Sequence, residues 1–197
     1  MQQSRVIPSP RSFACDLATL CAPTLAGLKP ASLFRYQPAP GQDAAAMAAA
    51  WHAALSPRGV TVRVLKQCPR TGAVLVYVYR PARVARLLAA PHMLDFLAGE
   101  GYTPGTADEL LDQLAERLCC EGDFPHEIGV FLGYPLSDVV GFIENSGRNF
   151  TCCGCWKAYG DLQAAQRHFA QLRKCTAVYL RLFHSGTPIL RDRKSVV

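Results

Sequence analysis

The clearest pattern in the chain is an alternation of valines with other residues on both sides of a short polar segment. The alternating positions are Val60, Val62 and Val64 before the segment CPRTG, and Val74, Val76 and Val78 after it. Successive side chains of a β-strand point to opposite faces, so each run predicts a strand with one apolar face. Proline and glycine between the runs favour a turn, and residues 60–78 are therefore predicted to form a β-hairpin.

Other apolar residues recur at helical spacing behind residues that suit the start of a helix. Asp43 precedes the segment AAAMAAAWHAAL, Thr106 and Glu109 have the spacing of a capping box, and Asp161 precedes a periodic segment ending near Leu172. Their side-chain oxygens can accept hydrogen bonds from the free amides of a first helical turn. Three more helices are predicted, through Leu17 and Leu20, from Pro81 to Leu88, and over Met93 to Leu97.

The last third of the chain predicts two short helices and further strands. Residues 124–145 repeat apolar positions at i, i+3 and i+4 in two groups, which is typical of two short helices. Phe150–Tyr159 is expected to be a strand, and Thr176–Phe183 has the β-branched and aromatic content of another. Near the other end, prolines and a glycine punctuate the stretch Cys21–Phe34.

These elements together predict an α+β fold. We expect a mixed, mostly antiparallel sheet of about four or five strands with helices packed on it. The length of 197 residues is close to that of one domain, and no internal repeat is present. The predicted organisation is a flexible N-terminal tail over residues 1–11, a single domain over residues 12–190 and a basic C-terminal tail over residues 191–197.

Charge is distributed unevenly along the chain. The net charge is +6, and from Gln166 onward seven Lys and Arg residues face one acidic residue, Asp192. This imbalance predicts a basic C-terminal surface, which could steer an anionic ligand or a nucleic acid. The sequence contains no recognition-helix, zinc-finger or RNA-binding signature. It therefore argues against a nucleic-acid partner and favours a solvated face.

Cysteine usage and hydropathy indicate the compartment. Nine cysteines are an odd number in a chain too large to need disulfides, which favours reduced thiols in the cytosol. The apolar segment 13–28 contains Asp16 and Pro23, so it does not suit a signal peptide. No apolar run approaches the ~20 residues of a membrane span. We expect a cytoplasmic protein with no membrane partner.

Four stretches of the chain resemble one uncharacterised family. They are CAPTLAGLKPASLF, LVYVYRP, FPHEIGVFLGYPLSDVVGFIEN and GCWKAYGD. In order and spacing, from about position 17 to about position 186, they are similar to the family catalogued as domain of unknown function 3793. The final RDRKSVV and the alanine-rich segment near residues 43–54 depart from the family pattern, outside the matched stretches. The resemblance implies membership of a family that brings no established activity, substrate, cofactor or catalytic residue.

A cluster of cysteines is the candidate metal or redox site. Cys152 and Cys155 have the CxxC spacing used for zinc, iron–sulfur clusters and dithiol chemistry, and Cys153 lies between them. A four-ligand metal site would recruit another thiol, for instance Cys175 or the adjacent pair at 119 and 120. The alternative is that these are buried or incidental thiols, because free cysteine is among the most buried residue types.

A thiol-dependent enzyme is the second hypothesis. Cys21 lies near the start of a helical turn, and His126 lies at the start of another, so a nucleophile and a base are available. Adjacent residues point in different directions on a helix, so Glu127 does not suit the role of orienting His126. Asp138 or Asp123 would be needed instead. The alternative is that both candidates are structural.

A binding module is the third hypothesis. Lys29, Tyr134, Trp156 and Lys157 could line a pocket for a small anionic or aromatic ligand, and Arg80, Arg181 and Tyr159 could contribute. Neither a P-loop nor a dinucleotide fingerprint is present, so the cofactor is left open. The sequence favours a small cytoplasmic ligand-binding or regulatory protein, with the thiol enzyme and the metal protein as alternatives, and it does not decide whether the protein is an enzyme.

Overall fold

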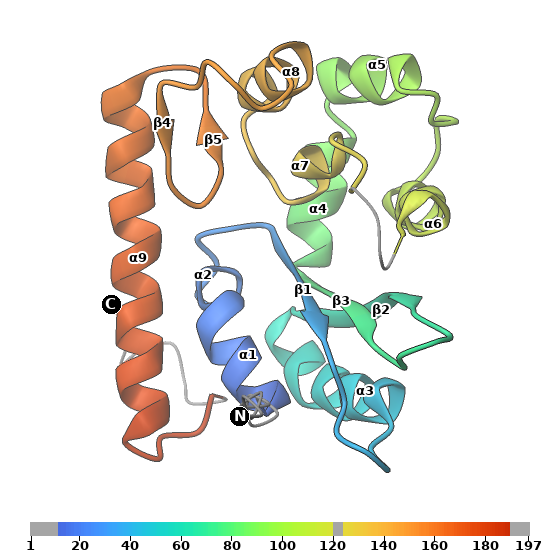
Figure 1. The fold of residues 1–197 in the computed structure, drawn as a ribbon, viewed down its shortest axis with the longest axis vertical. Helices are drawn as coiled ribbons and strands as arrows, with labels where there is room; N and C mark the ends of the chain where they lie inside the picture. The colour runs from blue at the N-terminus through green and yellow to red at the C-terminus, as the bar shows by residue number, and fades with distance from the viewer. Residues whose placement is uncertain (1–11, 120–123, 190–197) are drawn as a thin grey trace, which may run out of the picture.

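Three antiparallel strands form the main sheet of the computed structural model, which describes residues 12–119 and 124–189 (Figure 1). The strand order is β1 (Ala31–Tyr36), β3 (Val74–Tyr79), β2 (Thr61–Gln67). The β2–β3 pair confirms the predicted hairpin, with Val62 opposite Val78 and Val64 opposite Val76. Strand β1 was not predicted, because it follows directly on the punctuated segment that ends at Pro30.

Both faces of β3 are buried, which divides the apolar core into two parts. The valines of β3 pack with α1 (Phe13–Leu20) and α3 (Ala44–Leu55) on one face. The residues of β3 that alternate with these valines pack against the helices on the other face of the sheet. They are Leu75, Tyr77 and Tyr79. The alternation of valines in the sequence predicted one apolar face. In the structure both faces of β3 are buried, and each belongs to a different apolar core.

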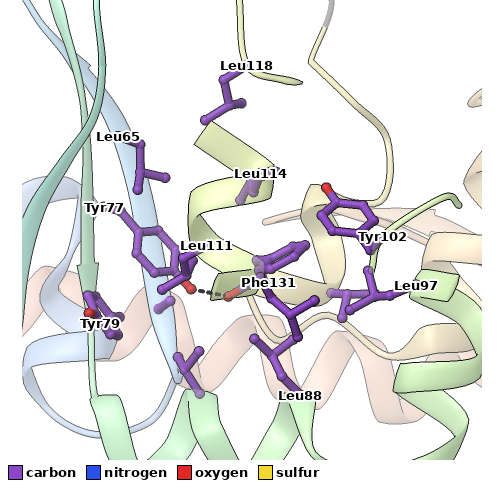
Figure 2. Close-up of a cluster of buried hydrophobic side chains, with 14 of the residues drawn as sticks. Leu65, Tyr77, Tyr79, Leu88, Leu97, Tyr102, Leu111, Leu114, Leu118 and Phe131 are labelled. Carbon is purple, nitrogen blue, oxygen red and sulfur yellow. Dashed lines mark hydrogen bonds between the residues drawn. The ribbon is translucent and has the colours of Figure 1, made fainter. Parts of the chain in front are cut away.

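The second core is built by helices that follow the sheet in the chain. These are α4 (Pro81–Leu88), α5 (Pro91–Gly99), α6 (Ala107–Arg117), α7 (Ile128–Phe131) and α8 (Leu136–Glu144). Figure 2 shows their leucines and Phe131 gathered against Tyr77 and Tyr79 of the sheet. The buried Tyr77 hydroxyl donates to the Phe131 carbonyl oxygen at 2.5 Å, so the phenol is satisfied without water.

The predicted helix starts are confirmed in their capping contacts. Asp43 accepts from the amides of residues 45 and 46 at 2.8 and 3.1 Å. Thr106 and Glu109 form the complete capping box at the start of α6. Asp161 accepts from two amides of α9 (Leu162–His184), at 2.7 and 3.1 Å. The two short helices predicted within residues 124–145 are α7 and α8.

Two predicted strands take other forms. Phe150–Tyr159 is a small hairpin, β4 (Cys152–Cys153) and β5 (Lys157–Ala158), whose turn is closed by a 2.9 Å bond from the Gly154 amide to the Trp156 carbonyl. The prediction of a strand at Thr176–Phe183 is wrong, because α9 continues through it. No glycine or proline lies between Asp161 and Gly186, and the apolar residues of α9 recur at a helical spacing and pack against α1 and α2.

The α+β fold class is confirmed, with two antiparallel sheets of three and two strands in place of one mixed sheet. The tails predicted at 1–11 and 191–197 lie outside the described residues, and the single domain over residues 12–190 stays a prediction. Within the part of the chain that the structure describes, no helix is both long and apolar enough to cross a membrane.

Candidate functional site

Three separate loops bring together three of the four predicted binding residues. Lys29 lies between α2 (Ala22–Leu25) and β1, Tyr134 lies between α7 and α8, and Trp156 lies in the β4–β5 turn. The Lys29 ammonium is 5.1 Å from the centroid of the Tyr134 ring. The Tyr134 ring stacks on Trp156 with centroids 4.6 Å apart and planes 22° apart. A cation and two aromatic rings therefore form one continuous array.

A glycine allows the loop of Tyr134 to approach Lys29. Gly133 has a φ of 76°, a conformation that other residues rarely adopt. A Cβ atom at this position would lie 2.1 Å from Cγ of Pro30, the residue after Lys29. The backbone at position 133 can therefore lie against the Pro30 ring only because this position has no side chain, and this contact sets Tyr134 beside Lys29.

Two arginines of α4 and its N-cap hold the loop that precedes Lys29. The Arg80 guanidinium donates from Nε to the Thr24 carbonyl oxygen at 2.8 Å, and Arg83 donates to the Gly27 carbonyl oxygen. The Lys29 amide itself donates to the Pro23 carbonyl oxygen at 3.1 Å. Arg80, which the sequence suggested as a pocket residue, thus supports the backbone of this loop.

Asp138 of α8 fixes the hairpin that carries Trp156. Its side chain is 6% exposed, and its Oδ2 accepts from the Trp156 indole N–H at 2.7 Å. Its Oδ1 accepts from the amides of Tyr159 and Gly160 at 2.7 and 3.2 Å. A buried carboxylate with three donors is well compensated for its lost hydration. Sequence reasoning considered Asp138 only as a partner of His126 and missed this role.

Glycines also set the contacts of the hairpin. A Cβ atom on Gly141 of α8 would lie 2.5 Å from Cγ of the Tyr159 ring, and one on Gly154 would lie 2.3 Å from Cδ2 of Phe169. Phe169 of α9 also meets the Trp156 ring at a 4.6 Å centroid distance and 82°. The Trp156 indole is therefore packed between Tyr134 and Phe169, with its N–H already bonded.

Cys155, at the tip of the hairpin, lies close enough to influence the pKa values of Lys29 and Tyr134. Its side chain is exposed. Burial lowers the pKa of Lys29, and the nearby thiols of Cys155 and Cys21 act in the opposite direction. Burial raises the pKa of Tyr134 to about 12, with a smaller contribution from Cys155. We call Lys29, Tyr134 and Cys155 the Lys29 site.

Lys157, the fourth predicted binding residue, serves a different contact. Its ammonium donates to the Gly147 carbonyl oxygen at 2.7 Å and lies 5.5 Å and 5.2 Å from the ring centroids of Phe142 and Phe150. This arrangement closes the loop between α8 and β4. The structure therefore does not bring Lys157 into the Lys29 site.

The predicted catalytic pair lies in two different environments. Cys21 is 0% exposed between α1 and α2, and burial raises its pKa, so the thiol is protonated at neutral pH. His126 is exposed and makes an edge contact with the Phe142 ring at 5.0 Å. Across residues 12–119 and 124–189 no hydrogen bond joins the two side chains. The geometry gives this pair no support, and Asp123 lies outside the described residues.

Glu127 belongs to a buried cluster of its own. It accepts from the Tyr102 hydroxyl at 3.0 Å and from Arg117 at 3.4 Å. The Arg117 guanidinium also lies 3.8 Å from the Tyr102 ring centroid. Burial and the Glu127 carboxylate raise the pKa of Tyr102. These three side chains contact one another, and they join α6 to the segment before α7.

The four predicted metal ligands are spread over the β4–β5 hairpin and α9. Cys152 and Cys175 are half-buried, whereas Cys153 and Cys155 are exposed. Burial raises the pKa of Cys175. Among the residues whose positions are described, no group of three or more His, Cys, Asp or Glu side chains is arranged to hold a metal ion. Metal binding by these thiols stays a prediction.

Comparison with known proteins gives a family and no function. The family model described as "Protein of unknown function (DUF3793)" matches residues 17–191. This match covers most of the chain, so the chain belongs to that family, as its four sequence stretches predicted. No curated protein and no solved structure matches the chain. What the protein does must therefore be argued from its own side chains.

Proposed function

We propose that this member of the DUF3793 family is a ligand-binding protein that takes a small anion at the Lys29 site. One observation carries the proposal. Lys29 is a half-buried cation, and no carboxylate of the described residues forms an ion pair with it. Its ammonium contacts the face of the Tyr134 ring instead. A partly desolvated charge without a counter-ion is costly, and a bound anion would offset that cost.

The neighbours of Lys29 add donors for an anion. Burial raises the pKa of Tyr134 to about 12, so its hydroxyl stays neutral and can donate a hydrogen bond at physiological pH. The exposed Cys155 thiol is a weaker donor on the same cluster. One ammonium with two neutral donors suits a single carboxylate or phosphate group. The absence of a glycine-rich phosphate loop from the sequence agrees with this small ligand.

The aromatic rings do not offer a stacking surface to a ligand. Trp156 covers one face of the Tyr134 ring, and the Lys29 ammonium lies over the ring as well. Trp156 itself lies between Tyr134 and Phe169. Stacking of a flat ligand would require these contacts to break. Of the two ligand classes that the sequence suggested, we therefore infer the anionic one.

The test is a thermal unfolding screen with named anions. Inorganic phosphate, pyrophosphate, citrate and ATP are added separately to the purified chain, and the midpoint is followed. An anion present at 100 times its Kd should raise the midpoint by roughly 5–10 °C, because it stabilises the folded state by about 2.7 kcal/mol. Lys29→Met should abolish the shift. Its matched control, Arg86→Met, removes the same charge from an exposed position of α4 and should keep the shift.

Two outcomes would overturn the proposal. Either none of the four anions raises the midpoint of the wild-type chain, or Lys29→Met responds as strongly as Arg86→Met. Folding of Lys29→Met is checked by its circular dichroism and by its midpoint without added anion.

We also infer a cytoplasmic location, supported by the eight described cysteines, all of which are free.

A further inference from the structure

A row of cations runs along one side of α9. The helix extends unbroken over Leu162–His184, and this segment contains no Asp or Glu. Arg167, Lys174 and Arg181 follow one another at intervals of seven residues. Seven residues are close to two helical turns, so the three side chains share one face at intervals of about 10.5 Å along the axis. We call these three residues the α9 row.

The α9 row faces away from the rest of the described molecule. Phe169 and Leu172, which are buried, lie on the opposite side of the helix. Figure 1 shows α9 along one edge of the molecule, with α1, α2 and the β4–β5 hairpin all on its inner side, and these elements contact it. All three residues of the row are exposed. The row is therefore accessible along its whole length of about 21 Å.

The charges of the α9 row are not neutralised within the described residues. The ion pairs found there involve Arg63 and Arg117 and no cation of α9. Asp161 has a lowered pKa. The hydrogen bonds from the helix amides to its carboxylate are the main cause, and the charge of Arg167 contributes less. Arg173, next to the row, adds a further exposed cation. The surface is thus a rigid line of positive charge.

We propose that the α9 row binds the phosphate backbone of a nucleic-acid duplex, independently of the Lys29 site. A duplex presents phosphates about every 3.4 Å along each strand, so a row of about 21 Å spans about six base-pair steps. Ala170 and Ala177 lie between the cations and leave them room to reach phosphates. Between Arg167 and Arg181 this face carries no aromatic ring on which unpaired bases could stack, and its largest apolar side chain, Val178, is half-buried and offers little to a membrane.

The lack of a base-reading motif in the sequence is compatible with this surface. Phosphate contacts position a protein on a duplex without reading bases, so they need cations at the right spacing and no recognition signature. The expected strand at Thr176–Phe183 would have placed Arg181 on a separate element. Only the continuous helix aligns it with Arg167 and Lys174.

The experiment measures binding of the full chain to a labelled 20-base-pair duplex by fluorescence anisotropy, with DNA and RNA in separate arms. Three phosphate contacts predict a slope of about −2.7 for log K against log salt, which is an affinity loss of about 40-fold between 50 and 200 mM. The triple variant R167Q/K174Q/R181Q should lose at least tenfold in affinity and most of this slope. Lys29→Met should bind the duplex as the wild type does.

A charge-matched control separates the row from net charge. R35Q/R86Q/R148Q removes three exposed cations that lie outside α9 and should bind within about twofold of the wild type. Equal loss in the two triple variants would overturn the proposal, as would failure of the wild type to bind either duplex at 50 mM salt. Binding to phosphatidylserine vesicles without binding to a duplex would assign the row to membranes and would also overturn it. Circular dichroism confirms that each variant is folded.

Discussion

The region around the main sheet and the region around the β4–β5 hairpin are held together by different forces. The central strand of the sheet, β3, is buried on both faces between two clusters of apolar side chains. The hairpin instead depends on one buried carboxylate, Asp138, and on close contacts at Gly141 and Gly154. Apolar burial is spread over many residues, whereas the hairpin relies on a few irreplaceable groups. Substitutions should therefore disturb the two regions in different ways.

The largest expected effect is in the sheet region. Phe131 is 0% exposed and packs against the rings and leucines of the second core. Phe131→Ala should lower the free energy of unfolding by about 3–5 kcal/mol, because it removes buried apolar surface and leaves a cavity. Urea denaturation followed by circular dichroism measures this change. Leu20→Ala, at a position 44% exposed, is the control, and a similar loss in both variants would contradict this view of the core.

A smaller effect is expected at the hairpin. Asp138→Ala removes the acceptor of the Trp156 indole and of two amides, and should cost about 2 kcal/mol. The emission of Trp156 should also change, because its N–H loses a charged partner. Asp95→Ala removes an exposed acid of α5 and serves as the matched control. Unchanged stability and emission in Asp138→Ala would show that the hairpin does not depend on this carboxylate.

The smallest effect is a difference in alkaline stability. Burial raises the pKa of Tyr134 to about 12, whereas a tyrosine of the unfolded chain titrates near 10. The neutral phenol therefore stabilises the folded state fully below about pH 10, and this contribution is lost as the pH rises towards 12. Between pH 9 and 11 the wild type should lose about 1 kcal/mol more stability than Tyr134→Phe.

The same titration can be compared with the sheet region. Burial raises the pKa of Tyr77 well above its usual value, so its contribution should persist to higher pH than that of Tyr134. Urea titrations of Tyr77→Phe and Tyr134→Phe at each pH provide the measurement. Equal pH dependence of Tyr134→Phe and the wild type would mean that the Tyr134 hydroxyl is hydrated in the folded state.

The sequence predicted the elements whose signals are local. The valine alternation defined β2 and β3, and Asp43, Thr106 and Asp161 each capped the helix that they preceded. The failure at Thr176–Phe183 has a physical cause. Residue composition favoured a strand there, but a helix already begun at Asp161 continues at little cost until a breaking residue, and its apolar side packs against α1.

The site was predicted only in part. Residue chemistry selected Lys29, Tyr134 and Trp156, and the structure brings them together. It did not exclude Lys157, whose bond to the Gly147 carbonyl depends on how the loop after α8 folds. Residue chemistry also missed the role of Asp138, because the three N–H groups that donate to this carboxylate lie about twenty residues further along the chain. Such partners are set by tertiary structure, which no local pattern encodes.

The contact between α9 and the first two helices has a consequence for biosynthesis. Helices α1 and α2 leave the ribosome before α9, yet part of their surface is covered by this later helix, which ends at His184. At about 5–20 residues per second, that covering helix follows on the order of ten seconds later. During this interval the nascent chain exposes an apolar surface that the finished protein hides, and a chaperone that binds such surfaces would find its target there.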